Sequence, residues 1–116
     1  MLGLCLRDGH DGRKPEADEG ISAMSDRPTF TLGIEEEYLI VDRETRDLVR
    51  EPGEEFLEAC RKEVGDQVTS EYLQCQIEVG TRPHRSVADA VGELTGLRKS
   101  LAKVCDAHGY AAIAAS

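Results

Sequence analysis

Three consecutive glutamates lie in the middle of a segment that otherwise has the composition of a β-strand, Thr31–Asp42, with the sequence TLGIEEEYLIVD. Residues along a strand alternate between its two faces. The middle glutamate, Glu36, therefore shares a face with the apolar Leu32, Ile34, Tyr38 and Ile40. Glu35 and Glu37 lie on the other face. The segment predicts a strand over residues 29–41 that is apolar on one face and acidic on the other.

The two acids on the outer face need a compensating charge. Glu35 and Glu37 would stand about 6–7 Å apart on one side of the strand. At an effective dielectric constant of about 20, their repulsion is on the order of 2–3 kcal/mol. A divalent cation between them would turn this repulsion into attraction, so the next question is whether the chain supplies further ligands.

A second segment, Tyr72–Thr81, alternates in the same way and also carries an acid. Its apolar face holds Leu73, Cys75, Ile77 and Val79. Its polar face holds Glu78 together with Gln74 and Gln76, which we expect to be ordinary polar residues, with lining of a substrate pocket as the alternative. If the two strands are neighbours in one sheet, the outer acids of the first strand converge with Glu78, and Glu71 stands behind them. Carboxylate oxygens suit one or two Mg²⁺ ions better than Zn²⁺, whose His and Cys ligands are missing.

Short elements connect the two strands. Residues 42–47 are polar and typical of a turn, and Leu48–Val49 begins a short return strand. The segment Pro52–Glu55 opens a helix with an acidic first turn, which suits the positive end of the helix dipole. Its apolar stripe holds Phe56, Leu57, Cys60 and Val64, and Gly65 ends it. A short extended piece follows at 68–70.

A longer helix follows the second strand. Ser86, with Asp89 three residues on, forms a capping-box-like start. The predicted buried stripe holds Val87, Ala90, Val91, Leu94, Leu97, Leu101 and Val104. Gly109 ends this helix, and residues 110–116 look like a further strand of small residues, which leaves a sheet edge without a partner.

Composition limits the class of protein. The 116 residues carry a net charge of −9, which argues against nucleic acid or an anionic membrane surface as a partner. No apolar run approaches the ~20 residues that a membrane helix needs, and the start of the chain does not resemble a signal peptide. The four cysteines show no C-x-x-C spacing. We expect them to be reduced and to act as small core residues in a cytoplasmic protein.

The first part of the chain differs from the rest. Residues 1–27 contain scattered glycines, Pro15 and mixed charges without periodicity. We predict a disordered tail there, with Met24 as an alternative translation start. Residues 28–116 are then one domain of ordinary size.

Two motifs together resemble the opening of the carboxylate–amine ligases of the glutamate–cysteine ligase type 2 family. The first is GIEEEYLIVD, residues 33–42, and the second is EYLQCQIEVGT, residues 71–81. The spacing between them fits that family, and so does the long 86–108 helix that leads to an Ala-rich strand. The resemblance covers residues 29–116.

The resemblance implies an α+β fold related to glutamine synthetase, with an antiparallel sheet curved around the active site and helices packed on one face. It implies ATP-dependent joining of glutamate, through an acyl phosphate, to cysteine or another amine, with Mg²⁺ or Mn²⁺ neutralising the phosphates. The family's metal ligands map to Glu35 and Glu37, and its second-motif acid maps to Glu78. Glu71 occupies the place of a further acid near the metals. Glu36, on the opposite face of the strand, is expected to have a structural role or to support the metal ligands.

Family members are several times longer, so the resemblance implies an N-terminal portion of a catalytic domain that is not expected to be active alone. The residues that hold ATP would then lie elsewhere. The expected partners are a complementing C-terminal fragment or further copies of the chain in a homo-oligomer. The alternative is a truncated, non-catalytic remnant, or an interaction module that pairs through its open sheet edge. Arg82 and Arg85 are expected to be solvated loop residues, with contact to phosphate or a substrate carboxylate as the alternative.

Overall fold

The long strand β2, Phe30–Asp42, is the centre of the sheet. The computed structural model describes residues 2–8, 29–70 and 75–114, with the backbone alone for residues 2–8. All strand pairs of the five-stranded sheet are antiparallel. Strands β4, Gln76–Gly80, and β3, Val68–Ser70, follow one another on one side of β2. On the opposite edge, β1, Leu2–Asp8, pairs with residues 30–36 of β2, and β5, Tyr110–Ile113, pairs with residues 39–42.

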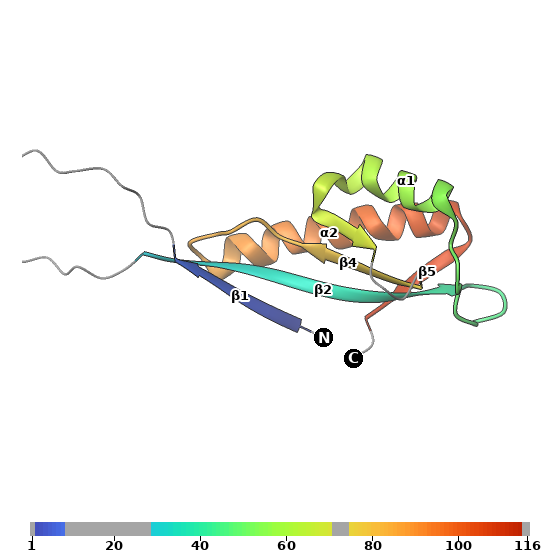
Figure 1. Ribbon diagram of the computed structural model, residues 1–116, viewed down its shortest axis with the longest axis horizontal. Helices are drawn as coiled ribbons and strands as arrows, with labels where there is room; N and C mark the ends of the chain where they lie inside the picture. Colours follow the sequence, from blue (N-terminus) through green and yellow to red (C-terminus); the bar gives the residue numbers. More distant parts are fainter. Residues whose placement is uncertain (1, 9–28, 71–74, 115–116) are drawn as a thin grey trace, which may run out of the picture.

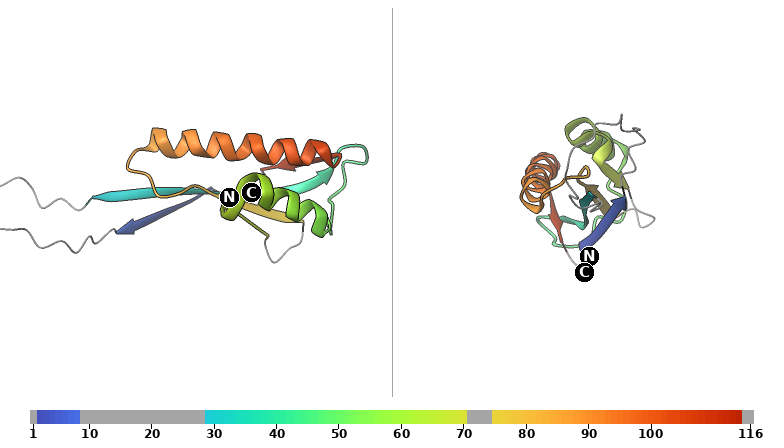
Figure 2. Two further views of the ribbon diagram at one scale, coloured as in Figure 1. Left: turned by 90° about the horizontal axis from the view of Figure 1, so that it is seen from above. Right: turned by 90° about the vertical axis from the view of Figure 1, so that its left-hand side faces the viewer.

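Both helices cover one face of this sheet (Figure 1). Helix α1 is Glu54–Val64, the 3₁₀ turn η1 is Gly65–Gln67, α2 is Val87–Ala107, and β5 is Tyr110–Ile113. Figure 2 shows the two helices side by side above the strands. The core lies between these layers, and its fully buried side chains include Ile40, Phe56, Ile77, Val79 and Leu101. The predicted antiparallel sheet with helices on one face is therefore confirmed.

The helix boundaries have the causes that the sequence predicted. Glu54 and Glu55 stand in the first turn of α1, and Gly65 follows its last residue with a φ of 77°, a value that favours glycine. The Ser86 hydroxyl accepts a hydrogen bond from the Asp89 N–H at 3.1 Å, which caps the start of α2. No helix in the described part of the chain is long and apolar enough to cross a membrane.

The predicted buried stripe of α2 is wrong at its first turns. Val87 is 62% exposed and Val91 is 47% exposed, whereas Ala90 and Leu94 are buried. Helix α1 is shorter than α2 and covers its C-terminal part (Figure 1). The N-terminal turns of α2 therefore pack against the sheet alone, and the buried stripe is narrower there.

Three further predictions differ from the structure in extent. Residues 2–8 form strand β1, although a disordered tail was predicted over residues 1–27. The alternating leucines at the start of the chain suit a strand. The rest of the predicted tail lies outside the described residues. The return strand at Leu48–Val49 is reduced to one bridge between Val41 and Leu48. Strand β4 is shorter than predicted, and residues 71–74 lie outside the described part.

The exposure pattern of α2 predicts a contrast between two of its apolar residues. Leu101→Ala should lower the free energy of unfolding by about 2–5 kcal/mol, because Leu101 is 1% exposed. The matched control Val87→Ala should change it by no more than about 0.5 kcal/mol. Urea unfolding followed by circular dichroism measures both. Equal losses would contradict the packing described here.

Candidate functional site

The register between β2 and β4 brings the predicted acids together. Glu37 pairs directly with Glu78, and Glu35 pairs with Gly80. The Ile40 N–H donates to the Cys75 carbonyl at 2.9 Å, so the even-numbered residues of β2 form the hydrogen-bonded pairs with β4. Glu37 and Glu78 are therefore a non-hydrogen-bonded pair, in which the side chains approach most closely.

All three acids lie on the face of the sheet opposite the helices. The alternating burial of β2 and β4 places Glu35, Glu37 and Glu78 outward and Glu36, Ile77 and Val79 inward. The two strands are neighbours, as predicted. Within residues 2–8, 29–70 and 75–114, no three His, Cys, Asp or Glu side chains are gathered closely enough to hold a metal ion. The metal role of these glutamates stays a prediction, and Glu71 lies outside the described residues.

A groove of about 450 Å³ runs along this acidic face. It is lined in part by Thr31, Gly33, Glu35, Glu78, Gly80 and Arg82. A β-carbon added at Gly80 would stand 3.6 Å from the Cγ of Glu35. The glycine therefore leaves room beside Glu35, which is exposed. The groove offers carboxylates, hydroxyls and one guanidinium group, a donor set that suits a hard cation carrying an anionic ligand.

Glu36, the middle glutamate of the motif, faces the helices and is bound by residues on that side. Glu36 is 4% exposed, and both of its carboxylate oxygens are bound by Arg98 of α2, with the Nε of Arg98 at 2.8 Å from Oε2. The Tyr38 hydroxyl donates to the same carboxylate. A forked Arg–carboxylate contact of this kind is among the strongest polar contacts in proteins. The predicted structural role of Glu36 is supported by this geometry.

The same contacts shift the ionisation of the group. Hydrogen bonds from Arg98 hold the pKa of Glu36 below its ordinary value, although burial acts in the opposite direction. Burial, with the neighbouring Glu36 carboxylate, raises the pKa of Tyr38 to about 12. Glu36 is therefore a charged anchor and Tyr38 a neutral donor near neutral pH, and neither is poised for proton transfer.

A second carboxylate, Glu93 of α2, organises one end of the groove. Its Oε2 accepts from the Arg82 backbone N–H at 3.0 Å and lies 2.5 Å from Nε2 of His84. Its Oε1 accepts from Nε2 of Gln67 at 2.8 Å, and Gln67 also donates to the Gly80 carbonyl at 3.0 Å. Burial raises the pKa of Glu93, but these hydrogen bonds together outweigh it, so the pKa lies below its ordinary value.

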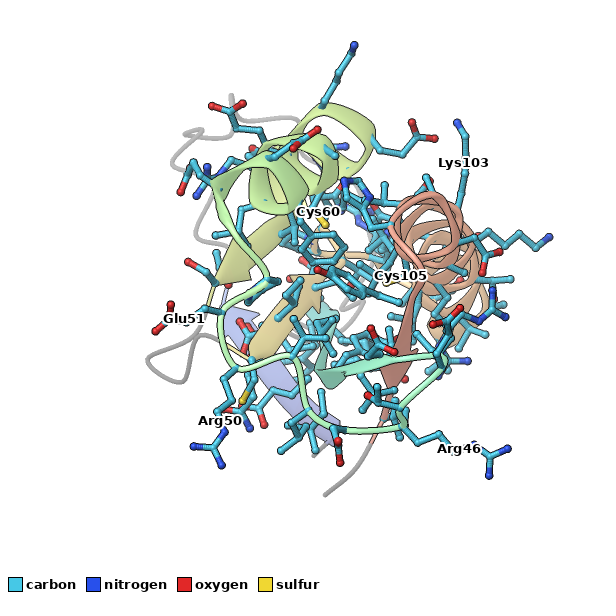
Figure 3. The ribbon with its side chains drawn as sticks, turned by 90° about the vertical axis from the view of Figure 1, so that its right-hand side faces the viewer. Arg46, Arg50, Glu51, Cys60, Lys103 and Cys105 are labelled. Carbon is cyan, nitrogen blue, oxygen red and sulfur yellow. The ribbon has the colours of Figure 1, made fainter. Side chains whose placement is uncertain are left out.

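Two cysteines are part of the core, as predicted. Cys60 and Cys105 are each 1% exposed, and Figure 3 shows them in the interior, whereas Arg46, Arg50 and Lys103 project outward. Burial raises the pKa of the Cys60 thiol to about 12 and that of Cys105 to about 11. Both thiols are therefore protonated near neutral pH and unsuited to act as nucleophiles or metal ligands.

The residues that the sequence interpretation missed are the polar partners on α2. Arg98 lies between Leu94 and Leu101 in helical spacing, so it borders the buried stripe. A charged residue at the border of a buried stripe can reach an acid that faces inward from the neighbouring strand. This pattern could have predicted the contact between Arg98 and Glu36. Glu93 has no comparable signal, because its partners come from separate turns and loops.

The fold and the site region are thus an antiparallel sheet with helices on one face, three acids on the open face, and a groove lined by Glu35 and Glu78. Residues 31–116 match the family described as glutamate-cysteine ligase family 2. The chain therefore belongs to this family, as its two motifs indicated.

Curated relatives give the same result. The chain is 49% identical over 90 residues to a protein of Paracoccus denitrificans, over 78% of this chain and 24% of the relative. Proteins of Jannaschia sp. and Ruegeria pomeroyi are 49% and 47% identical over 87 residues, which is 75% of this chain and 23% and 22% of theirs. All three carry the name "Putative glutamate--cysteine ligase 2". The chain thus spans about a quarter of the length of these relatives.

The ion pair between Glu36 and Arg98 predicts that substitutions of these two residues have non-additive effects on the free energy of unfolding. Arg98→Met should cost about 3 kcal/mol, the low end for breaking a buried pair, because Arg98 is half exposed and water can reach the abandoned Glu36 carboxylate. Adding Glu36→Leu should recover most of this loss, because apolar side chains then replace an ion pair. Urea unfolding of the two single variants and the double variant measures the coupling.

The pH dependence provides a control on the same variants. A carboxylate with a lowered folded-state pKa stabilises fully above its unfolded pKa of about 4.3, and this stabilisation is lost as the pH falls through the folded-state pKa. The wild-type free energy of unfolding should therefore fall more steeply in acid than that of the Glu36→Leu/Arg98→Met variant. Parallel acid slopes would show that Glu36 is not stabilised as a carboxylate.

Proposed function

We propose that this chain forms the cation-binding N-terminal part of an ATP-dependent carboxylate–amine ligase of the glutamate–cysteine type. One observation carries the proposal: Glu37 and Glu78 oppose each other directly on neighbouring strands, with Glu35 on the same open face. Like charges placed directly opposite each other destabilise a sheet. A cation would offset that cost, and the membership of the family supplies the reaction class.

The donor set fits Mg²⁺, with Mn²⁺ as a substitute. Glu35, Glu37 and Glu78 offer only carboxylate oxygens, and Glu71, which precedes β4 in sequence, is a further candidate ligand. Mg²⁺ binds through a few carboxylates together with substrate phosphates. When bound, it neutralises charge on ATP and on the transferred phosphoryl group. The glutamates of this chain would hold and orient that assembly on the open face of the sheet.

The proposed reaction has two steps. The side-chain carboxylate of glutamate takes the γ-phosphoryl group of ATP, which releases ADP and forms an acyl phosphate. The amine of cysteine, or another amine, then attacks the acyl carbon, releases phosphate and loses a proton, which forms a γ-glutamyl amide. Because the chain spans 24% of its Paracoccus relative, we propose that these 116 residues catalyse the reaction together with a further portion of the catalytic domain, and not alone.

The surrounding features are compatible with a cytoplasmic enzyme. Cys60, Cys75 and Cys105 are free thiols, the state expected in a reducing compartment. The net charge of −9 disfavours nucleic acid and anionic membranes as partners. We therefore place the reaction in the cytoplasm, with small molecules as substrates.

The opposed acids predict an effect of cations on stability. In a chelating buffer, Glu37→Gln should stabilise the chain by about 0.2–1 kcal/mol, because it removes a like-charge pair. Added Mg²⁺ should raise the unfolding temperature of the wild type more than that of this variant. Thermal unfolding of the 116-residue chain with and without Mg²⁺ measures both effects. The control Glu44→Gln, in an exposed turn, should behave as the wild type, and an equal Mg²⁺ response in all three proteins would contradict a cation site.

Catalysis is tested in a chimera in which residues 31–116 replace the matching segment of the Paracoccus relative. Glu35→Gln should lower glutamate- and cysteine-dependent ADP release by more than about 100-fold, beyond the 10–100-fold typical of residues that only support a metal ligand. Glu44→Gln is the control here as well. Normal turnover of the Glu35→Gln chimera would remove the assignment, and an inactive parent chimera that is folded would favour the non-catalytic remnant.

A further inference from the structure

Arg82 lines the groove. Its backbone is held by a hydrogen bond, whereas its side chain is exposed and can reach a ligand. Its N–H is held by Glu93, and the same carboxylate contacts His84, the residue that bridges to Leu32 of β2. Glu93 itself is mostly buried, with a side chain that is 21% exposed. A buried carboxylate whose acceptors are used on surrounding backbone and side chains holds this connection in one conformation.

The guanidinium of Arg82 has only a weak partner. Among the described residues, its ion pair is with Asp66 at 3.7 Å, and the two side chains are 67% and 89% exposed. Exposed pairs of this kind contribute about 0–1 kcal/mol. A ligand in the groove can therefore displace Asp66 at little cost.

The charges in the groove have opposite signs at different places. Glu35 and Glu78 line it together with Arg82. A cation beside the carboxylates would carry an anionic ligand, and Arg82 would face the oxygens of that ligand. Arginine binds carboxylate and phosphate oxygens through two parallel N–H donors. A chain with a net charge of −9 repels free anions in general, so anion binding here would need a specific donor.

We infer that Arg82 is the anion-binding residue of the groove, which takes the carboxylate or phosphate oxygens of a substrate, and that Glu93 is the positioning residue that holds Arg82 there. The inference rests on the proposed function for the identity of the anion as a substrate. It goes beyond the expectation that Arg82 is a solvated loop residue, because the Glu93 contacts and the groove separate Arg82 from its neighbour Arg85.

The test is an NMR titration of the ¹⁵N-labelled 116-residue chain. Inorganic phosphate and glutamate are added separately, each with and without Mg²⁺, and the amide shifts of Gly80, Thr81 and Arg82 are followed. The wild type should bind one of the two anions, and Arg82→Gln should bind it about tenfold more weakly, as expected for loss of a charge-assisted hydrogen bond. Whichever anion binds identifies phosphate or carboxylate as the source.

Arg85→Gln is the matched control, because Arg85 lies three residues away in sequence and does not line the groove. It should bind as the wild type. Glu93→Gln should also weaken anion binding, and it should speed hydrogen exchange of the Arg82 amide, which a general loss of stability would not do selectively. Wild-type affinity in Arg82→Gln, or no anion response in the wild type, overturns the inference.

The two proposals fail in different ways. If anion binding depends on Arg82 but no protein responds to Mg²⁺, the cation site fails and the role of Arg82 stands. If the Mg²⁺ response depends on Glu37 but Arg82→Gln is indistinguishable from the wild type, the role of Arg82 fails and the cation site stands.

Discussion

The ion pair between the buried Glu36 and the half-exposed Arg98 is the contact that allows a strand with three consecutive acids to belong to a core. A lone carboxylate at 4% exposure would be costly to bury, and the effective cost is several kcal/mol even after relaxation. Arg98 meets it with two donors, and Tyr38 adds a third. Because this pair joins β2 to α2, the helices can pack on the strand while the Glu36 carboxylate in its middle stays charged. The opposite face of the same strand is thereby left for the other two acids.

The two faces of β2 differ in whether a positive side chain of the protein balances their carboxylates. On the inner face, the negative charge of Glu36 is balanced by a cation of the protein itself. On the outer face, neither Glu35 nor Glu37 has an ion-pair partner among the described residues. The Glu36–Arg98 contact joins the middle of β2 to α2. The outer acids are thus held in a defined place by a contact that they do not make themselves.

Sequence alone predicted the features that depend on local periodicity. Alternation separated Glu36 from Glu35 and Glu37, and the capping residue Ser86 marked the start of α2. Features that depend on distant segments were not predictable in this way. The exposure of Val87 depends on how far α1 reaches, and the Glu93 contacts join residue 67 of η1 with residues 82 and 84 of the β4–α2 connection. The alternating leucines at the start of the chain suit a strand, but they do not indicate that residues 2–8 pair with β2.

Helix α2 contacts the site region through two polar networks that lie on opposite sides of its buried stripe. Glu93 and Arg98 are five residues apart, which places them about 140° apart around a helix with 3.6 residues per turn. The buried stripe, which includes Leu94, Leu97 and Leu101, lies between them. Apolar packing alone resists separation of the layers but only weakly resists rotation of the helix about its axis, since hydrophobic burial is not directional. Directional contacts on both flanks resist rotation in either sense, so α2 fixes the middle of β2 through Glu36 and the end of the groove through Arg82 at the same time.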